Sequence, residues 1–150
     1  RRMHARYHAR CLRAGQPAHR FAGSLPHDEV LAAMRHARVH VCPSLLETPG
    51  LANLEAGLLG CVLVVPDCPP VREAFGEHAI YVQPGATADL RRAVETAVAT
   101  EPDPALPARI RATYTWQQAA ARTREAYDLA IRAHAHRTDE HPQQQGAPRK

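Results

Sequence analysis

Lysine is almost absent from this sequence of 150 residues, in which Lys150 stands against 18 arginines. This scarcity excludes the lysine of a nucleotide-binding P-loop and a Schiff-base lysine in a pocket. Long hydrophobic runs are absent too, since no window of about 18 apolar residues occurs and arginines rather than an apolar segment follow the first residues. The sequence therefore predicts neither a membrane span nor a secretion signal.

Paired cysteine motifs are also missing. The four cysteines, Cys11, Cys42, Cys61 and Cys68, show no CxxC spacing. Cys42 and Cys61 fall within apolar, strand-like runs, where a free thiol packs as a small hydrophobic side chain. We expect reduced thiols and a cytoplasmic location, with the inner membrane surface as the alternative.

Positive charge is concentrated at the two ends of the chain. Residues 1–20 carry six arginines and no acid, whereas residues 21–131 carry nine cations and 13 acids. The pI is about 9.2, but the central part of the chain is acidic, so we expect no nucleic-acid partner. His4 and His8 have the i, i+4 spacing of metal ligands. Because arginines surround them, a solvated basic face is favoured over a metal site, and we expect no metal.

Strand-like and helix-like segments alternate along the chain. The run Cys61–Val65 is apolar on both faces, as a buried parallel strand requires. Shorter strands are expected at 39–42 and 79–82, and a weak one at His19–Ala22. Helices are expected at 1–14, 28–37, 51–59, 71–75, 88–99 and 106–132, the last of them interrupted at 114–116.

This alternation predicts an α/β fold, with a Rossmann-like parallel sheet and flanking helices. Three or four strands are fewer than such a domain usually has, so we expect an incomplete domain, the rear part of a doubly wound fold. We assign residues 1–132 to this partial domain and residues 133–150, which have little to bury, to a disordered tail. Tyr114, Trp116 and Tyr127 are expected to pack against the sheet rather than to form a stacking platform.

Two carboxylates follow the strand at 39–42. Glu47 lies in the loop and Glu55 about one turn into the next helix, with Gly50 at the helix start between them. The free amides of Gly50, Leu51 and Ala52 form a positive helix N-terminus suited to a phosphate, and the carboxylates can accept hydrogen bonds from sugar hydroxyls. A ligand with a sugar, a diphosphate and a ribose in that order fits the arrangement of an acceptor, amide donors and a second acceptor along this segment. An acid/base pair of a glycoside hydrolase is a weaker alternative, because nothing else in the chain supports it.

The segment Val41–Ala56, VCPSLLETPGLANLEA, resembles the signature of group 1, or family 4, glycosyltransferases. That signature is a strand ending in Pro-Ser, then a glutamate, seven residues and a second glutamate. The resemblance covers residues 21–131 in all. It includes FAGSLP at 21–26, GCVLVV at 60–65, EAFGEHA at 73–79 and a closing helix from Tyr114 to Tyr127.

Group 1 glycosyltransferases are retaining enzymes with two Rossmann-like domains, the GT-B fold, so the resemblance implies that this chain is the C-terminal, donor-binding half. It implies that Glu47 contacts the donor hexose as the catalytic carboxylate and that Glu55 accepts hydrogen bonds from the ribose hydroxyls. The donor-binding segment between them is Thr48-Pro49-Gly50-Leu51. The family residue matched by Pro49 is commonly aromatic and donates an amide. Because proline has no N–H, we expect one phosphate or sugar contact of the family to be missing here.

Three classes of function remain open, of which the weakest is a nucleic-acid-associated Rossmann protein, which a steep salt dependence of DNA binding would support. The first is the donor half of a hexosyltransferase that uses a nucleotide-activated sugar, needs no cofactor or metal, and serves an unknown acceptor, which is a glycan, a lipid or a small molecule. The second is a truncated nucleotide-sugar-binding module without transfer activity. The acceptor-binding N-terminal domain and the family's phosphate-clamping arginine and lysine are expected upstream, so we expect the isolated chain to be inactive. Arg72, the arginine near a strand-end loop, is given no role.

Overall fold

Three parallel strands form the centre of the structure, a computed structural model that describes the backbone of residues 2–140 and the side chains of residues 5–135. The strands are β1 (Val39–Val41), β2 (Val62–Pro66) and β3 (Ile80–Val82), in the order β1-β2-β3. Val39 pairs with Val62, and Val64 pairs with Ile80. The helices are α1 (Arg2–Ala14), α2 (His27–His36), α3 (Leu51–Leu58), α4 (Pro69–Phe75), α5 (Thr87–Ala99), α6 (Ala105–Thr113) and α7 (Trp116–Glu140).

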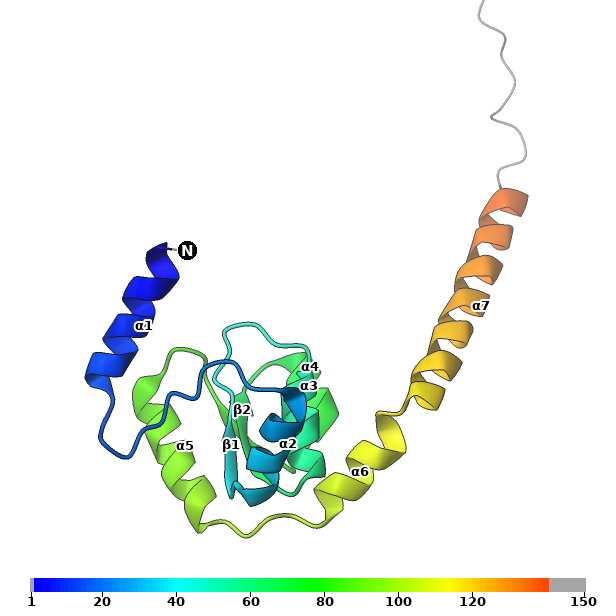
Figure 1. Cartoon of the computed structure of the whole chain (residues 1–150). Helices are drawn as coiled ribbons and strands as arrows, with labels where there is room; N and C mark the ends of the chain where they lie inside the picture. Colours follow the sequence, from blue (N-terminus) through cyan, green and yellow to red (C-terminus); the bar gives the residue numbers. More distant parts are fainter. Residues whose placement is uncertain (1, 141–150) are drawn as a thin grey trace, which may run out of the picture.

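The predicted α/β class, a parallel sheet with flanking helices, is confirmed, and so are the three strands that follow α2 (Figure 1). The weak strand expected at His19–Ala22 is wrong. Within the described residues this segment pairs with no strand, and the His19 amide instead donates to the Gln16 carbonyl at 2.9 Å in a turn. A run of β-forming residues becomes a strand only beside a hydrogen-bonding neighbour, which this segment lacks here.

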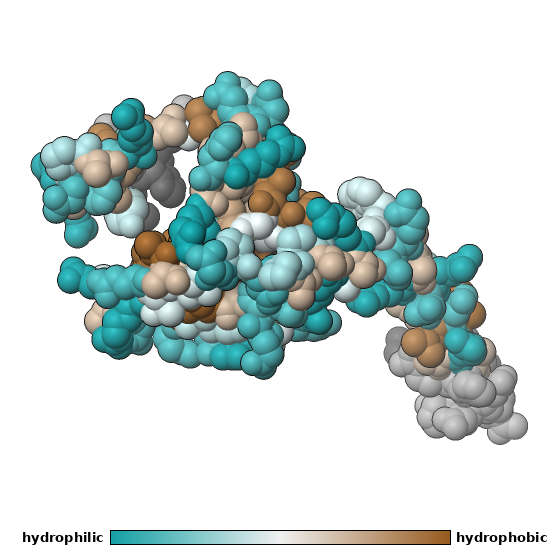
Figure 2. Space-filling model, turned by 90° about the horizontal axis from the view of Figure 1, so that it is seen from below, coloured by the Kyte–Doolittle hydropathy of each residue, from teal (hydrophilic) through white to brown (hydrophobic). Residues whose placement is uncertain are grey.

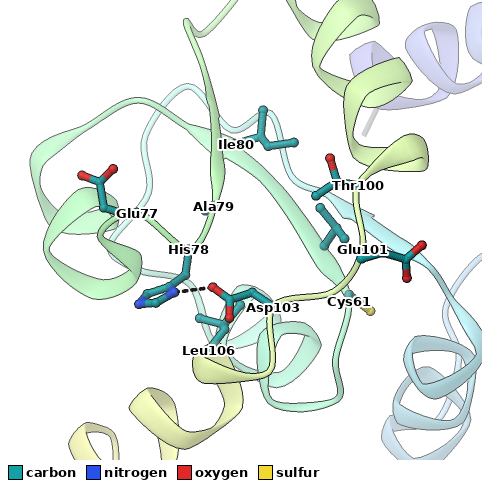
Figure 3. Close-up of a pocket in the computed structure, with 10 residues that line it drawn as sticks. Cys61, Glu77, His78, Ala79, Ile80, Thr100, Glu101, Asp103 and Leu106 are labelled. Atoms are coloured by element: carbon teal, nitrogen blue, oxygen red, sulfur yellow. Dashed lines mark hydrogen bonds and ion pairs between the residues drawn. The ribbon is translucent and has the colours of Figure 1, made fainter.

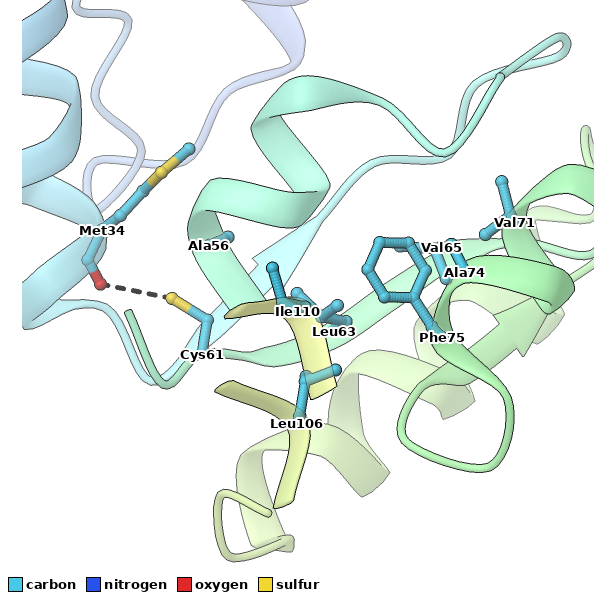
Figure 4. Close-up of a cluster of buried hydrophobic side chains, with 10 residues drawn as sticks. All are labelled: Met34, Ala56, Cys61, Leu63, Val65, Val71, Ala74, Phe75, Leu106 and Ile110. Carbon is cyan, nitrogen blue, oxygen red and sulfur yellow. Dashed lines mark hydrogen bonds between the residues drawn. The ribbon is translucent and has the colours of Figure 1, made fainter. Parts of the chain in front are cut away.

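Both faces of the sheet are covered, and β2 is therefore buried throughout its length. Leu63 and Val65 point to one face, where they join Phe75 and Ile110 in the larger cluster (Figure 4). Val62 and Val64 point to the other face, toward α5. Period-two alternation between two apolar layers is what a central parallel strand requires. The larger cluster comprises Met34, Ala56, Cys61, Leu63, Val65, Val71, Ala74, Phe75, Leu106 and Ile110.

Two arginines fasten helix ends to this layered core. Arg38, between α2 and β1, donates from Nε to the Val98 carbonyl at 2.7 Å and from Nη2 to the Thr100 carbonyl at 3.0 Å. Arg109 of α6 donates to the Ala74 and Glu73 carbonyls at the end of α4, both at 3.0 Å. The last carbonyls of a helix have no partner within the helix, so these guanidinium groups satisfy them and complement the helix dipole.

Helix α7 extends away from the sheet (Figure 1). Trp116 and Tyr127 have 89% and 66% of their surface exposed, and Tyr114 is also exposed. The expectation that these rings pack against the sheet is therefore wrong, because the helix that carries two of them leaves the core at Tyr114. Figure 2 shows hydrophobic residues on the surface of α7 among hydrophilic ones.

The helix also runs further than expected, to Glu140 rather than Arg132. Alanine and arginine, which are strong helix formers, continue beyond Arg132 and need no buried contact to favour the helix. Residues 133–140, at the start of the segment assigned to a disordered tail, are thus helical, and residues 141–150 lie outside the described part, so the tail assignment stays a prediction. In the described residues, no helix is long and apolar enough to cross a membrane.

Leu63→Ala should lower the free energy of unfolding by about 2–5 kcal/mol, because the side chain is fully buried at the centre of the larger cluster and its removal leaves a cavity. Urea denaturation followed by circular dichroism measures the change. Val98→Ala on α5, where the side chain is 55% exposed, is the control and should cost little. A loss below about 1 kcal/mol for Leu63→Ala would contradict the packing described.

Candidate functional site

The carboxyl ends of the three strands meet at one edge of the sheet. Cys42 follows β1, Asp67 follows β2 and Gln83 follows β3. Ligands of open parallel sheets bind at this edge. A cavity of about 310 Å³ lies here between α1 and the loops after β1 and β3. Tyr7, Pro43, Leu45, Gln83 and Thr87 are among the residues that line it.

Glu47 is half-buried and held at several points within the loop that follows β1. Its Oε1 accepts a hydrogen bond from the Thr48 amide at 3.2 Å, and its Oε2 lies 3.6 Å from Cys42 Sγ. The Cys68 thiol, from the loop after β2, donates to the Glu47 carbonyl at 3.6 Å. Both the carboxylate and the backbone of Glu47 are thus oriented by neighbours from two strand ends. The two cysteines are contacts of Glu47 that the sequence did not predict.

Gly50 permits the turn from this loop into α3. Its φ is +77°, a left-handed conformation that side chains disfavour. A Cβ at this position would lie 2.7 Å from Asn53 Nδ2 and 3.0 Å from Glu47 Cδ. Glycine is therefore required both by the backbone conformation and by the close approach of the two side chains.

The start of α3 differs in one respect from the expected phosphate cradle. The Gly50 amide donates to the Thr48 carbonyl, so it is not free as predicted. Leu51 and Ala52 occupy the first turn, and no side chain of the described residues caps α3. The amides of a first turn have no partner within the helix, so those of Leu51 and Ala52 remain available to an anion. The predicted cradle therefore loses the Gly50 donor as well as the one that Pro49 lacks.

Glu55 lies one turn into α3 and is also half-buried. Its Oε1 is 3.4 Å from Nε2 of His27, the first residue of α2, and 68% of the His27 side chain is exposed. No hydrogen bond or ion pair joins Glu55 to Glu47 in the part of the chain that the structure describes. The two carboxylates thus face different neighbours, and His27 is a neighbour that the sequence did not predict.

Asn53 is fully buried, although it is polar. Its Nδ2 lies 2.7 Å from the Pro49 carbonyl, and its Oδ1 lies 2.9 Å from Nε2 of His40 on β1. No role for Asn53 was predicted from the sequence. A signal was present, because Asn53 shares one face of α3 with the buried Ala56 and Gly57 at the i+3 and i+4 positions.

Arg72 is committed to a partner of its own. Its guanidinium donates to both carboxylate oxygens of Asp67, one of them from Nη2 at 2.8 Å, and stacks 4.3 Å from the centre of the Tyr81 ring. These hydrogen bonds hold the pKa of Asp67 below its ordinary value, and Gln83 adds a further one at 3.3 Å. Burial raises the pKa of the Tyr81 hydroxyl. The positive charge of Arg72 is therefore balanced by Asp67 at the strand-end edge, and the guanidinium is not free to bind a phosphate.

Two further hollows border the sheet or α3 within the described residues. One, of about 190 Å³, lies near the amino ends of β2 and β3 (Figure 3). Within it, Nδ1 of His78 lies 2.6 Å from Asp103 Oδ2, and this hydrogen bond lowers the pKa of Asp103. The other, of about 660 Å³, lies between Leu51 and the start of α7. Among residues 5–135, no group of three or more His, Cys, Asp or Glu side chains could hold a metal ion. Binding of the donor without a metal stays a prediction.

The family model of the glycosyl transferases group 1 matches residues 4–114 of the chain. The chain belongs to the group 1 glycosyltransferases. Glycogen synthase of Mycobacterium tuberculosis is 35% identical over 122 residues, which are 77% of this chain and 30% of that protein. One subunit of the phosphatidylinositol N-acetylglucosaminyltransferase of Arabidopsis thaliana is 27% identical over 113 residues, which are 73% of this chain and 25% of the relative.

A solved structure supports the fold of this group 1 glycosyltransferase chain. Sucrose-phosphate synthase from Thermosynechococcus elongatus superposes with a TM-score of 0.67 over 86% of this chain and 34% of that one, at 21% identity. The chain thus spans 30% or less of the two sequence relatives and about a third of the structural one. The predicted family is confirmed, whereas the roles of Glu47, Thr48, Pro49, Gly50, Leu51 and Glu55 stay predictions.

Asp67→Asn should remove a pH-dependent part of the stability. Because the pKa of Asp67 is lower in the folded chain, its contribution is fully present above the ordinary carboxyl pKa and is lost as the pH falls below about 4. The urea midpoints of wild type and variant should therefore differ at pH 7 and converge in acid. Asp128→Asn, at an exposed position of α7, is the control. A difference that stays constant between neutral and acid pH would argue against the Asp67–Arg72 pair.

Proposed function

We propose that this chain is the donor-binding part of a group 1 glycosyltransferase that transfers a hexose from a nucleotide-activated sugar, with retention at the anomeric carbon. The observation that carries the proposal is the placement of Glu47, Gly50 and the uncapped start of α3 at the carboxyl edge of a parallel sheet, in a chain of this family. Each part of the donor has a distinct place in this arrangement.

The diphosphate is assigned to the first turn of α3. The amides of Leu51 and Ala52 point out of an uncapped helix start, where the helix dipole favours negative charge. Pro49 and Gly50 contribute no free N–H, so this phosphate site has fewer amide donors than the family pattern. Because Arg72 is paired with Asp67, we assign neutralisation of the remaining phosphate charge to the arginine and lysine that we expect upstream.

The nucleotide and the sugar are assigned to the two carboxylates. Glu55 would accept hydrogen bonds from the ribose hydroxyls, and His27 beside it would be displaced or would share the carboxylate. Glu47, in the loop before the helix, would accept from hydroxyls of the hexose. A carboxylate fixed by the Thr48 amide and the Cys42 thiol is preorganised, and such fixed charges can act on the reacting sugar without rearrangement.

Transfer also needs an acceptor and the groups that bind it. One relative is named for glycogen and the other for phosphatidylinositol, so the family leaves the acceptor open between a glycan, a lipid and a small molecule. We assign acceptor binding to an N-terminal domain upstream, and we place the reaction in the cytoplasm. By itself the chain is then a nucleotide-sugar-binding module without turnover.

Glu55→Gln should weaken binding of nucleoside diphosphates about tenfold or more, because a hydrogen bond to a charged group contributes about 1.5–3 kcal/mol. Calorimetry with UDP and with ADP measures the affinity. His27→Gln serves as the control for loss of the 3.4 Å contact alone. An unchanged affinity in Glu55→Gln, with wild type binding normally, would remove Glu55 from the nucleotide site.

Glu47→Gln should separate sugar recognition from nucleotide recognition. Affinity for UDP or ADP should stay within about twofold of wild type, whereas the additional affinity for UDP-glucose or ADP-glucose should largely disappear, since only the sugar contacts Glu47 in this proposal. Circular dichroism recorded first confirms that the variant is folded. Equal losses for nucleotide and nucleotide sugar would assign Glu47 to the nucleotide or to folding.

A further inference from the structure

The fully buried side chain of Asn53 links three parts of the candidate site. It projects from α3, contacts the Pro49 carbonyl at 2.7 Å and contacts His40 on β1 at 2.9 Å. Burying a carboxamide away from water is costly unless its polar atoms are hydrogen-bonded. Both ends of this amide are satisfied, one by the loop before the helix and the other by the sheet.

The direction of each hydrogen bond follows from the donors available. A carbonyl can only accept, so the nitrogen of the Asn53 amide faces Pro49 and its oxygen faces His40. The oxygen of Asn53 can only accept as well. Nε2 of His40 must therefore carry a hydrogen. His40 thus donates to Asn53, and Asn53 donates in turn to the Pro49 carbonyl.

These two linked hydrogen bonds end at the Pro49–Gly50 peptide, which sets the turn from the loop into α3. The Pro49 carbonyl belongs to the peptide unit whose nitrogen is that of Gly50, and the Gly50 amide donates to the Thr48 carbonyl. Fixing the Pro49 carbonyl therefore fixes the plane of the Pro49–Gly50 peptide. The same Asn53 nitrogen and the Glu47 carboxyl carbon lie 2.7 Å and 3.0 Å from the point where a Gly50 Cβ would stand, so the three groups are packed together.

We propose that Asn53, held by His40, is the positioning residue that fixes the Pro49–Gly50 turn and with it the approach of Glu47 and the first-turn amides of α3 to the donor. The functional consequence rests on the proposed function, whereas the ordering of the loop does not. Asn53 acts through Pro49 and has no direct contact with the donor. An apolar residue of similar size fills the same space beside Ala56 and Gly57 but leaves the Pro49 carbonyl unbound.

The experiment compares Asn53→Leu and Asn53→Asp with wild type in the chain of 150 residues. Asn53→Leu removes both hydrogen bonds, and Asn53→Asp keeps the shape but removes the donor to Pro49. Amide hydrogen exchange of the segment 43–52 should become about tenfold faster in both variants, and affinity for UDP and ADP should fall about fivefold by calorimetry.

The matched control is Tyr81→Phe. The Tyr81 hydroxyl donates to the Gly76 carbonyl at 2.6 Å, so this change also deletes one hydrogen bond from a side chain to a carbonyl beside a left-handed turn, with the ring retained. It should leave exchange of segment 43–52 and nucleotide affinity as in wild type. Urea denaturation of every variant shows whether stability alone explains a change in exchange.

A second pair of variants tests the same contact from the sheet. His40→Phe keeps a ring but loses the donor, and should accelerate exchange of segment 43–52; His40→Gln places an N–H at a similar reach and should restore it. If Asn53→Leu fails to fold, this pair decides. Exchange that is unchanged in the variants, or equally fast in Tyr81→Phe, would overturn the positioning role. Fast exchange combined with a wild type that binds neither UDP nor ADP would support the positioning role and reject the proposed function.

Discussion

The parallel pairing of β2 with β1 and β3 is the interaction on which the rest of the structure depends. Leu63 and Val65 bury one face of β2 against the larger cluster, and Val62 and Val64 bury the other against α5. Because all three strands run in the same direction, the loops that follow them emerge at one edge. Burial of a single strand therefore both anchors the helices and assembles the candidate site.

Within that site, close packing around Gly50 is the constraint that orders the other groups. A left-handed turn without a Cβ lets the Glu47 carboxyl group and the Asn53 amide come together beside the start of α3. Hydrogen bonds from Thr48 and from two thiols then orient Glu47. The site is therefore made of short contacts within one loop and one helix turn, supported by the ends of two neighbouring strands.

Elements with a strong local pattern could be predicted from the sequence. The run at 61–65 and the helical spacing in α2, α3 and α5 each depend on burial of one face or both, which apolar periodicity records directly. The order of matches around Glu47 and Glu55 likewise predicts the family, which the family model confirms.

Features that depend on a distant neighbour could not be predicted. The strand expected at His19–Ala22 needed a partner strand, and Trp116 needed a surface to pack against. The contact of Glu55 with His27 and the donation from Gly50 to Thr48 arise from how the chain turns back on itself, which spacing does not encode. The burial of Asn53 also depends on distant partners, because a polar residue in a helix is usually exposed and the hydrogen bonds to His40 and Pro49 are what allow it to be buried.

The position of the candidate site within the chain has a consequence for how it folds. Val39 pairs with Val62, so the loop with Glu47 and helix α3 form the crossover between β1 and β2. Contacts of this kind are non-local, and loop closure entropy must be overcome before they stabilise the chain. The loop cannot reach its final geometry until the crossover is closed. Ligand-binding competence should therefore arise no earlier than the pairing of β1 with β2.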